Sequence, residues 1–193
     1  MSRTDAIAGR KIVAGMAAFI VVYAAVSWLD LTTTVLALGH AGATEGNTYA
    51  TDASVYLQGR ALLITLAGAA MIGACFLWSA LTANRIAGEW LDRPLASFGR
   101  FYINPFSPVT LDRSPLHMLS YVIAFAVLRV LAAGNNLMIA AIGWGPLGAL
   151  IGMLTRHMPA TFAFWIVLGP LYVVLAIAVS PVAAALARWF RAS

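Results

Sequence analysis

Two charged residues lie inside apolar segments of the sequence, and they are its strongest candidates for chemistry. Asp30 falls within the run SWLDLTTTVLAL, and Arg129 falls within another apolar run later in the chain. Ionisable side chains inside a membrane commonly serve proton relay or ion binding. A carboxylate and a guanidinium that stay paired instead hold neighbouring helices together. The sequence leaves both interpretations open.

Helical geometry predicts that these two residues meet. With about 3.6 residues per turn, Asp30 shares one helix face with Tyr23, Ser27 and Thr34. At about 1.5 Å per residue, Asp30 lies ~27 Å along its segment, and Arg129 lies ~20 Å along its own, with a long side chain that reaches further. We therefore expect an Asp30–Arg129 pair near the outer face of the membrane.

Other segments are expected to deliver polar groups to the same layer. Arg60 opens a later span from the outer side, and Glu45 and Asn47 follow the first span in a polar loop. Asn135 and Asn136 lie about one and a half turns beyond Arg129. The sequence thus predicts a water-accessible pocket with these candidate residues: Asp30, Thr34, Glu45, Asn47, Arg60, Arg129, Asn135 and Asn136.

No motif of a known catalytic type accompanies these residues. His40, His117 and His157 are far apart and lack paired-ligand spacing, and the sequence has no G-x-S-x-G elbow or P-loop. We therefore predict no catalytic residue, no metal site and no cofactor, and we favour a protein that is not an enzyme.

The composition predicts the environment in which these residues lie. Of 193 residues, 62% are hydrophobic and 10% are charged, whereas a soluble domain has about 25% charged residues. Much of the apolar surface must therefore face lipid. The net charge of +5 comes from basic residues scattered between apolar runs, a pattern that indicates membrane topology rather than nucleic-acid binding.

A crossing helix needs about 20 apolar residues, and the sequence offers several such runs. We expect one all-α, polytopic transmembrane helical bundle over residues 1–193, with four full spans at about 12–38, 61–81, 116–133 and 160–186. The proline- and arginine-rich segment 84–115 is expected to lie along the inner interface or to dock a cytoplasmic partner. The broken apolar tract 134–159 is expected to form an outer re-entrant or interfacial hairpin, or else a fifth span.

The distribution of Lys and Arg predicts the orientation. With four spans, only Arg60 and Arg156 lie outside and Arg129 lies within the membrane, while the other nine basic residues share the inner side. Because basic residues favour the cytoplasmic side, we expect both termini in the cytoplasm of a bacterial inner membrane. Five spans would give eight against three.

One stretch of the sequence resembles a known family. Asp30, Thr34 and Gly39, followed by Glu45 and Asn47, are similar to the Asp…Thr…Gly…Glu-x-Asn-Pro pattern of a family of small, uncharacterised prokaryotic membrane proteins. The similarity covers about residues 27–60, and Thr48 stands where that pattern has proline. The resemblance implies a role for these residues but no particular reaction.

Three functions remain open at this point. The first is a small, non-enzymatic subunit or accessory of a larger membrane assembly, with a protein partner or a second copy of the chain within the lipid bilayer. The second is a small transporter or channel component that uses the outer pocket around Asp30 and Arg129. The third is a membrane-embedded enzyme that modifies a lipid, with Asp30 or Glu45 as general base.

Overall fold

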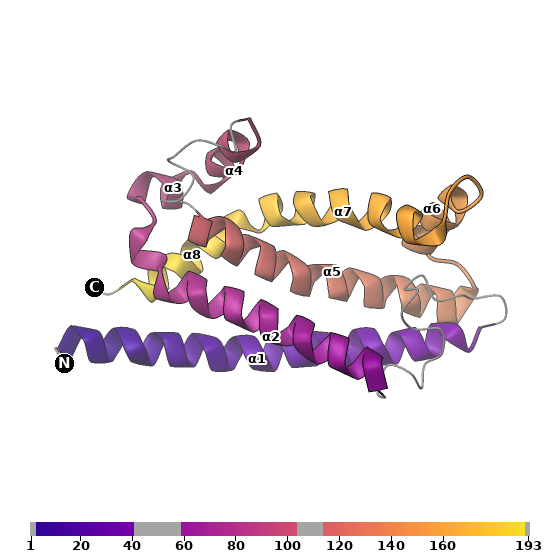
Figure 1. The fold of residues 1–193 in the computed structure, drawn as a ribbon, viewed down its shortest axis with the longest axis horizontal. Coiled ribbons are helices and arrows are strands. Elements are labelled where there is room, and N and C mark those ends of the chain that lie inside the picture. Colours follow the sequence, from indigo (N-terminus) through magenta and orange to yellow (C-terminus); the bar gives the residue numbers. More distant parts are fainter. Residues whose placement is uncertain (1–2, 41–58, 104–113, 192–193) are drawn as a thin grey trace. The chain divides into compact units, whose positions relative to one another are not determined.

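Over the residues that the structure describes, the chain folds into helices joined by short turns (Figure 1). This computed structural model describes residues 3–40, 59–103 and 114–191. Within these ranges there is no β-strand. The fold class expected from the sequence, an all-α helical protein, is therefore confirmed.

Four long helices carry most of the apolar sequence: α1 (Arg3–Leu38), α2 (Gly59–Leu81), α5 (Ser114–Ile142) and α7 (Ala160–Ala178). Parts of α1, α5 and α7 are long and apolar enough to cross a membrane, and α2 contributes the shorter apolar stretch Thr65–Leu81. Even the 19 residues of α7 would extend ~29 Å, close to the thickness of the hydrocarbon layer. These helices are those of a membrane protein.

The remaining helices are short: the 3-10 turn η2 (Ala83–Arg85), α3 (Gly88–Asp92), α4 (Pro94–Ile103), α6 (Pro146–Leu154) and α8 (Ser180–Phe190). Proline lies in the first turn of α4, α6 and α8. There its missing N–H costs no hydrogen bond, and its fixed φ suits a helix start. The proline-rich segment after α2 is accordingly divided into η2, α3 and α4.

Helix α5 is longer than the sequence suggests. The third span was expected to reach Ala133, yet α5 runs on through Asn135 and Asn136 to Ile142. The break falls at Gly143, which has a φ of 70°. Because a left-handed φ carries no steric penalty in glycine, Gly143 is a natural place for the chain to leave the helix.

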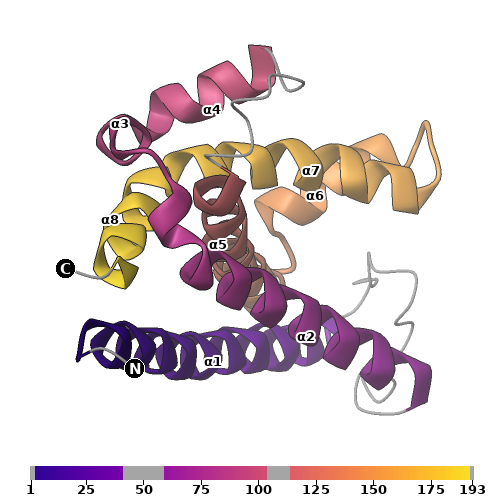
Figure 2. The same ribbon diagram turned by 60° about the vertical axis from the view of Figure 1, so that its left-hand side comes forward.

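The last apolar segment is two helices rather than one. The span expected over 160–186 ends as α7 at Ala178, and α8 begins at Ser180 with Pro181 in its first turn. A proline cannot continue an incoming helix because its ring clashes with the preceding turn. In both ribbon views α8 departs from the line of α7 (Figures 1 and 2).

The structure divides into two compact units, and each is described by itself. Unit 1 comprises residues 1–22, 71–125 and 173–193, and unit 2 comprises residues 23–70 and 126–172. The helices α1, α2, α5 and α7 each contribute one part to unit 1 and one part to unit 2.

Aromatic rings form the centre of unit 1. Phe76 of α2 stacks on Phe19 of α1 with ring centroids 4.3 Å apart, and it meets Phe190 of α8 edge-on at 5.8 Å. Gly15 lies against the same ring, since a Cβ added there would fall 2.6 Å from a carbon of Phe190. The absent side chain at Gly15 thus lets α1 approach α8 closely.

Arginines of α8 fasten this helix to the short helices of unit 1. Arg188 donates to the backbone carbonyl of Leu91 at 2.6 Å and to the carboxylate of Asp92 at 2.8 Å. Arg191 donates to the carbonyl of Ile86. Helix-terminal carbonyls lack intrahelical donors, so the guanidiniums supply the missing hydrogen bonds.

The long helices differ in how much of their apolar surface is enclosed. Only 11% of the most apolar window is buried in α1 and in α7, against 39% in α5. Side chains such as Trp28, Phe162 and Trp165 are about two-thirds exposed. A soluble monomer rarely leaves such large apolar patches open, so these faces are suited to lipid or to a partner helix.

Candidate functional site

The predicted contact between Asp30 and Arg129 is present in unit 2. Arg129 of α5 donates from Nη1 to Oδ2 of Asp30 on α1, at 3.0 Å. Each side chain is 23% exposed, so the pair is largely but not completely enclosed. A charge-assisted hydrogen bond of this length is among the stronger interactions that join two helices.

Tyr23 lies on the same face of α1 as Asp30, about two turns before it, and it makes a further contact with Arg129. The guanidinium carbon of Arg129 lies 5.5 Å from the centroid of the Tyr23 ring, within the range of a cation–π interaction. The same guanidinium thus contacts a carboxylate and an aromatic face of α1. Both contacts come from the polar stripe that the helical spacing predicts.

A second polar link between the same helices lies one turn further along α1. Asn136 of α5 donates from Nδ2 to Oγ1 of Thr34 at 2.9 Å. The Thr34 hydroxyl in turn donates to the backbone carbonyl of Asp30 at 2.8 Å. Both hydrogen-bonding roles of this hydroxyl are therefore used inside unit 2.

The neighbouring threonines serve α1 itself. Thr32 and Thr33 donate to carbonyls of the preceding turn, Thr32 to Trp28 at 2.9 Å and Thr33 to Leu29 at 2.8 Å. Such bonds satisfy a hydroxyl without any partner from another helix. The three consecutive threonines are thus tolerated in an apolar helix. Among the described residues, Thr34 alone of the three also accepts a hydrogen bond from another element.

Asn135 has a different role from Asn136. Its Oδ1 accepts hydrogen bonds from the backbone N–H groups of Leu147 at 2.9 Å and Gly148 at 3.3 Å. These groups belong to the first turn of α6, whose own N-cap, Gly145, has no side chain to offer. The amide of α5 therefore caps α6, in the way that a Ser or Asn at the N-cap position ordinarily does.

The structure leaves the other candidate residues outside this cluster. Arg60 lies in α2, with only its backbone described, and Glu45 and Asn47 lie outside the described residues. The structure thus brings together Asp30, Thr34, Arg129 and Asn136, places Asn135 at α6, and leaves the other three as predictions.

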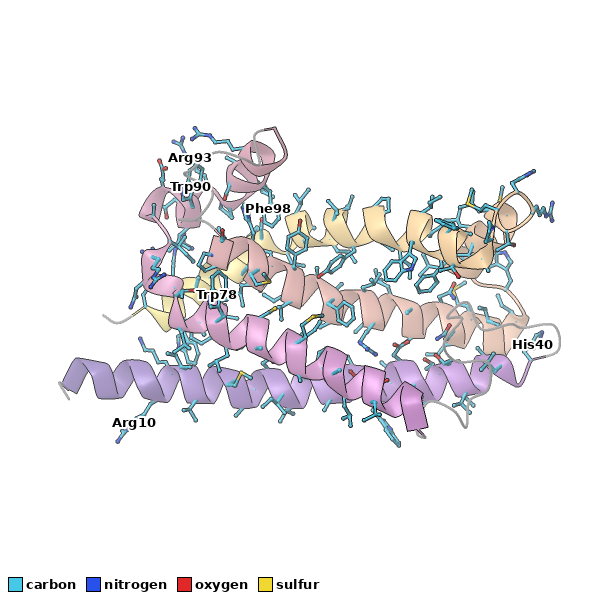
Figure 3. The ribbon with its side chains drawn as sticks, viewed as in Figure 1. Arg10, His40, Trp78, Trp90, Arg93 and Phe98 are labelled. Carbon is cyan, nitrogen blue, oxygen red and sulfur yellow. The ribbon has the colours of Figure 1, made fainter. Side chains whose placement is uncertain are left out.

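The histidines of the described chain lie apart. His40 follows α1 and lies against the turn after α5, where a Cβ at Gly143 would come 3.3 Å from its Cε1 (Figure 3). His117 is buried in unit 1. Among the described residues, no group of three His, Cys, Asp or Glu is placed to hold a metal ion.

Sequence reasoning missed two polar contacts. In unit 1, Ser97 of α4 and His117 of α5 share a buried hydrogen bond of 2.8 Å between Oγ and Nε2, and Phe98 packs on the histidine ring at 4.3 Å. No spacing in the sequence signals this contact. The cap by Asn135 does leave a signal, because a helix that starts Gly-Pro lacks a capping side chain of its own.

Comparison with known proteins gives no relative for this arrangement. No protein-family model, no curated protein and no solved structure matches the chain. Its function is therefore inferred from its residues and their geometry.

Proposed function

We propose that the chain is a small, non-enzymatic membrane protein that acts as a subunit or accessory of a larger membrane assembly. The observation that supports this most directly is the use of the polar groups in unit 2. The Asp30 carboxylate accepts a hydrogen bond from the Arg129 guanidinium, and the Thr34 hydroxyl accepts one from the Asn136 amide. Polar side chains that bond one another across helices fix the packing of membrane helices.

The uneven enclosure of the long helices also supports a subunit role. Only 11% of the most apolar window is buried in α1 and in α7, and Trp28 on α1 and Trp165 on α7 are exposed. Large aromatic residues are enriched where proteins meet partners. In this proposal the polar links keep the chain's own helices in register, while the open faces meet lipid and the neighbouring subunit.

The distribution of basic residues supports a placement in a bacterial inner membrane with both termini in the cytoplasm. Arg3, Arg10 and Lys11 precede the apolar part of α1. Arg188 lies in the last turn of α8, and Arg191 directly follows that helix. The positive-inside tendency places such residues on the cytoplasmic side.

The test is the native mass of the tagged chain after mild extraction from its own membrane. A subunit gives a defined particle heavier than the 20.4 kDa chain, with fixed stoichiometry in native mass spectrometry. Two differently tagged copies distinguish a homo-oligomer from a complex with another protein. A monodisperse monomer in digitonin and in lipid nanodiscs would contradict the proposal.

A second candidate function, a transporter or channel component, is favoured by one feature close to Asp30. Ser27 lies on the stripe with Asp30, and its Oγ is buried with no hydrogen-bond partner among the described residues. Together with the 23% exposure of Asp30 and Arg129, this leaves a polar position for water or a solute. A solute that raises the Tm of the wild type but not of Asp30→Asn would support this candidate. If the two proteins show the same shift in Tm with every cation and small solute of a broad panel, the candidate is removed.

A further inference from the structure

A separate pocket in unit 1 carries two guanidiniums and an aromatic ring. It has a volume of about 410 Å³ and is formed by α3, α4 and the residue between them. Its lining residues are Glu89, Trp90, Asp92, Arg93, Ala96 and Arg100. We propose that this pocket binds the phosphodiester headgroup of an anionic phospholipid. This inference is independent of the Asp30–Arg129 and Thr34–Asn136 contacts in unit 2 and of the proposed subunit role.

Arg100 is held in place by the tryptophan of the pocket. Its guanidinium carbon lies 5.1 Å from the centroid of the Trp90 ring, and Trp90 is itself 3% exposed. A guanidinium can stack on an aromatic face while the N–H groups at its edge stay available as donors. The buried indole therefore orients Arg100 before any ligand binds.

Arg93 provides the second guanidinium. It follows α3 directly, and its backbone N–H is bonded to the carbonyl of Glu89 at 3.0 Å, which fixes the start of its side chain. Figure 3 shows Arg93 and Trp90 on the same α3–α4 segment. Within the described part of the chain, neither Arg93 nor Arg100 forms a salt bridge. Planar guanidiniums match the oxygen pairs of a phosphate.

The acidic residues of the pocket set its net charge. Asp92 is paired with Arg188 at 2.8 Å, which leaves Glu89 as the second carboxylate. Arg93, Arg100 and Arg188 carry three positive charges against two negative ones, a net charge of +1. A phosphodiester carries one negative charge and balances it, whereas a zwitterionic headgroup adds an ammonium that does not.

An exposed apolar side chain next to the lining residue Ala96 favours a lipid over a soluble phosphate. On α4, Phe98 faces the core of unit 1 while Leu95 is 55% exposed. Basic residues next to exposed aliphatic and aromatic side chains are typical of segments that lie at a membrane surface and contact anionic lipids.

The test is a thermal unfolding experiment on the full chain in detergent, titrated with dioctanoyl phosphatidylglycerol. We expect a saturable rise in Tm, a smaller rise with dioctanoyl phosphatidylcholine, and none with inorganic phosphate at equal concentration. Equal stabilisation by phosphatidylcholine would overturn the preference for an anionic headgroup. Equal stabilisation by inorganic phosphate would assign the pocket to a free ion and overturn the proposal that its ligand is a lipid.

Variants then locate the site. The double change Arg93→Gln and Arg100→Gln should weaken phosphatidylglycerol binding by at least about tenfold, because two charge-assisted contacts are lost. Arg10→Gln makes a charge change of the same kind at an exposed position of unit 1 outside the pocket and should leave the affinity unchanged. Equal weakening per charge removed would indicate general attraction and overturn the site.

A gain of affinity guards against variants that fold poorly. Glu89→Gln removes a negative charge from the pocket wall and should tighten phosphatidylglycerol binding several-fold. Misfolding cannot produce such a gain. Unchanged or weaker binding by Glu89→Gln would contradict the proposed position of the phosphate.

Discussion

Gly145 lies so close to Asn135 that a Cβ added to the glycine would fall 2.8 Å from the backbone carbonyl oxygen of Asn135. This approach lets the Asn135 amide reach the N–H groups of Leu147 and Gly148. Three residues therefore act together: Asn135 near the end of α5 caps α6, Gly145 allows the close approach, and Pro146 begins the helix.

Gly145→Ala should destabilise the protein by about 1–3 kcal/mol, because the new methyl group collides with backbone that cannot rotate away. Gly152→Ala is the control within α6, the helix that Gly145 caps, since a Cβ at Gly152 meets nothing within 4 Å. It should be neutral or stabilise by up to about 1 kcal/mol, as expected when alanine replaces glycine in a helix. Urea unfolding in detergent followed by circular dichroism measures both, and equal effects would contradict the assigned contact.

Asn135→Ala should cost about 1 kcal/mol, the usual effect of losing a helix cap. Asn135→Asp retains an acceptor oxygen and should keep most of the stability. Hydrogen exchange of the Leu147 and Gly148 amides gives a local readout, with faster exchange in Asn135→Ala only. Unaltered protection of these amides in Asn135→Ala would show that the cap contributes nothing.

Asp30→Ala and Arg129→Ala should each lower Tm, because each leaves one charge of the pair without its partner in a largely enclosed position. If the pair is a structural link, the exchanged protein carrying Asp30→Arg and Arg129→Asp should recover most of the loss. If the pair serves transport, the single variants should fold normally and lose only flux. If the single variants fail to fold and the exchanged protein does not recover, the two side chains stabilise the fold through contacts other than their charge pair.

Thr34→Val and Asn136→Leu should show coupling in a double-mutant cycle. Hydrogen bonds between membrane helices are worth about 0.6 kcal/mol on average in such cycles, and we expect a value of this order. Thr32→Val is the control. Its hydroxyl bonds to carbonyls of its own helix and to no other element that the structure describes, so it should show no coupling to Asn136→Leu. Zero coupling for Thr34 as well would remove the second link between α1 and α5.

Ser97→Ala should destabilise the protein by about 1–3 kcal/mol, since it takes a hydrogen-bonding partner from the buried ring of His117. Ser79→Ala offers a comparison at an equally buried serine, whose hydroxyl, within the part of the chain that is described, bonds to the carbonyl of Cys75 in its own helix. Its effect on Tm should be much smaller. Similar Tm values for the two variants would mean that the α4–α5 contact adds no stability.

The parts of the fold that follow from local pattern could be predicted from the sequence. The apolar runs gave the long helices, and helical periodicity with rise per residue placed Asp30 and Arg129 at matching depth. The predicted extent of the spans was less accurate. Gly134, Asn135 and Asn136 do not break α5, because the two amides find partners on other elements and a glycine inside a helix costs only about 1 kcal/mol.

The features that depend on tertiary contact could not be predicted. The Ser97–His117 bond and the aromatic contacts of Phe76 join residues that no spacing rule connects. The Gly-Pro start of α6 does signal a missing cap, but it does not identify Asn135 as the residue that supplies it. Whether Asn135 lines a pocket or caps a helix is decided by the course of the chain after Ile142, where one glycine at φ 70° redirects it. Arg60, Glu45 and Asn47 remain predictions for the polar layer.

The pairing of Asp30 with Arg129 has a consequence for how the protein is made. The two residues are 99 positions apart, so the ribosome completes α1 long before it synthesises the guanidinium. Thr32 and Thr33 need no later segment, because their hydroxyls are bonded within α1. The contact of the Asp30 carboxylate with Arg129 must wait for α5. The arrival of α5 therefore adds a charged link to a first helix that α2, synthesised earlier, already contacts through Phe76 and Phe19.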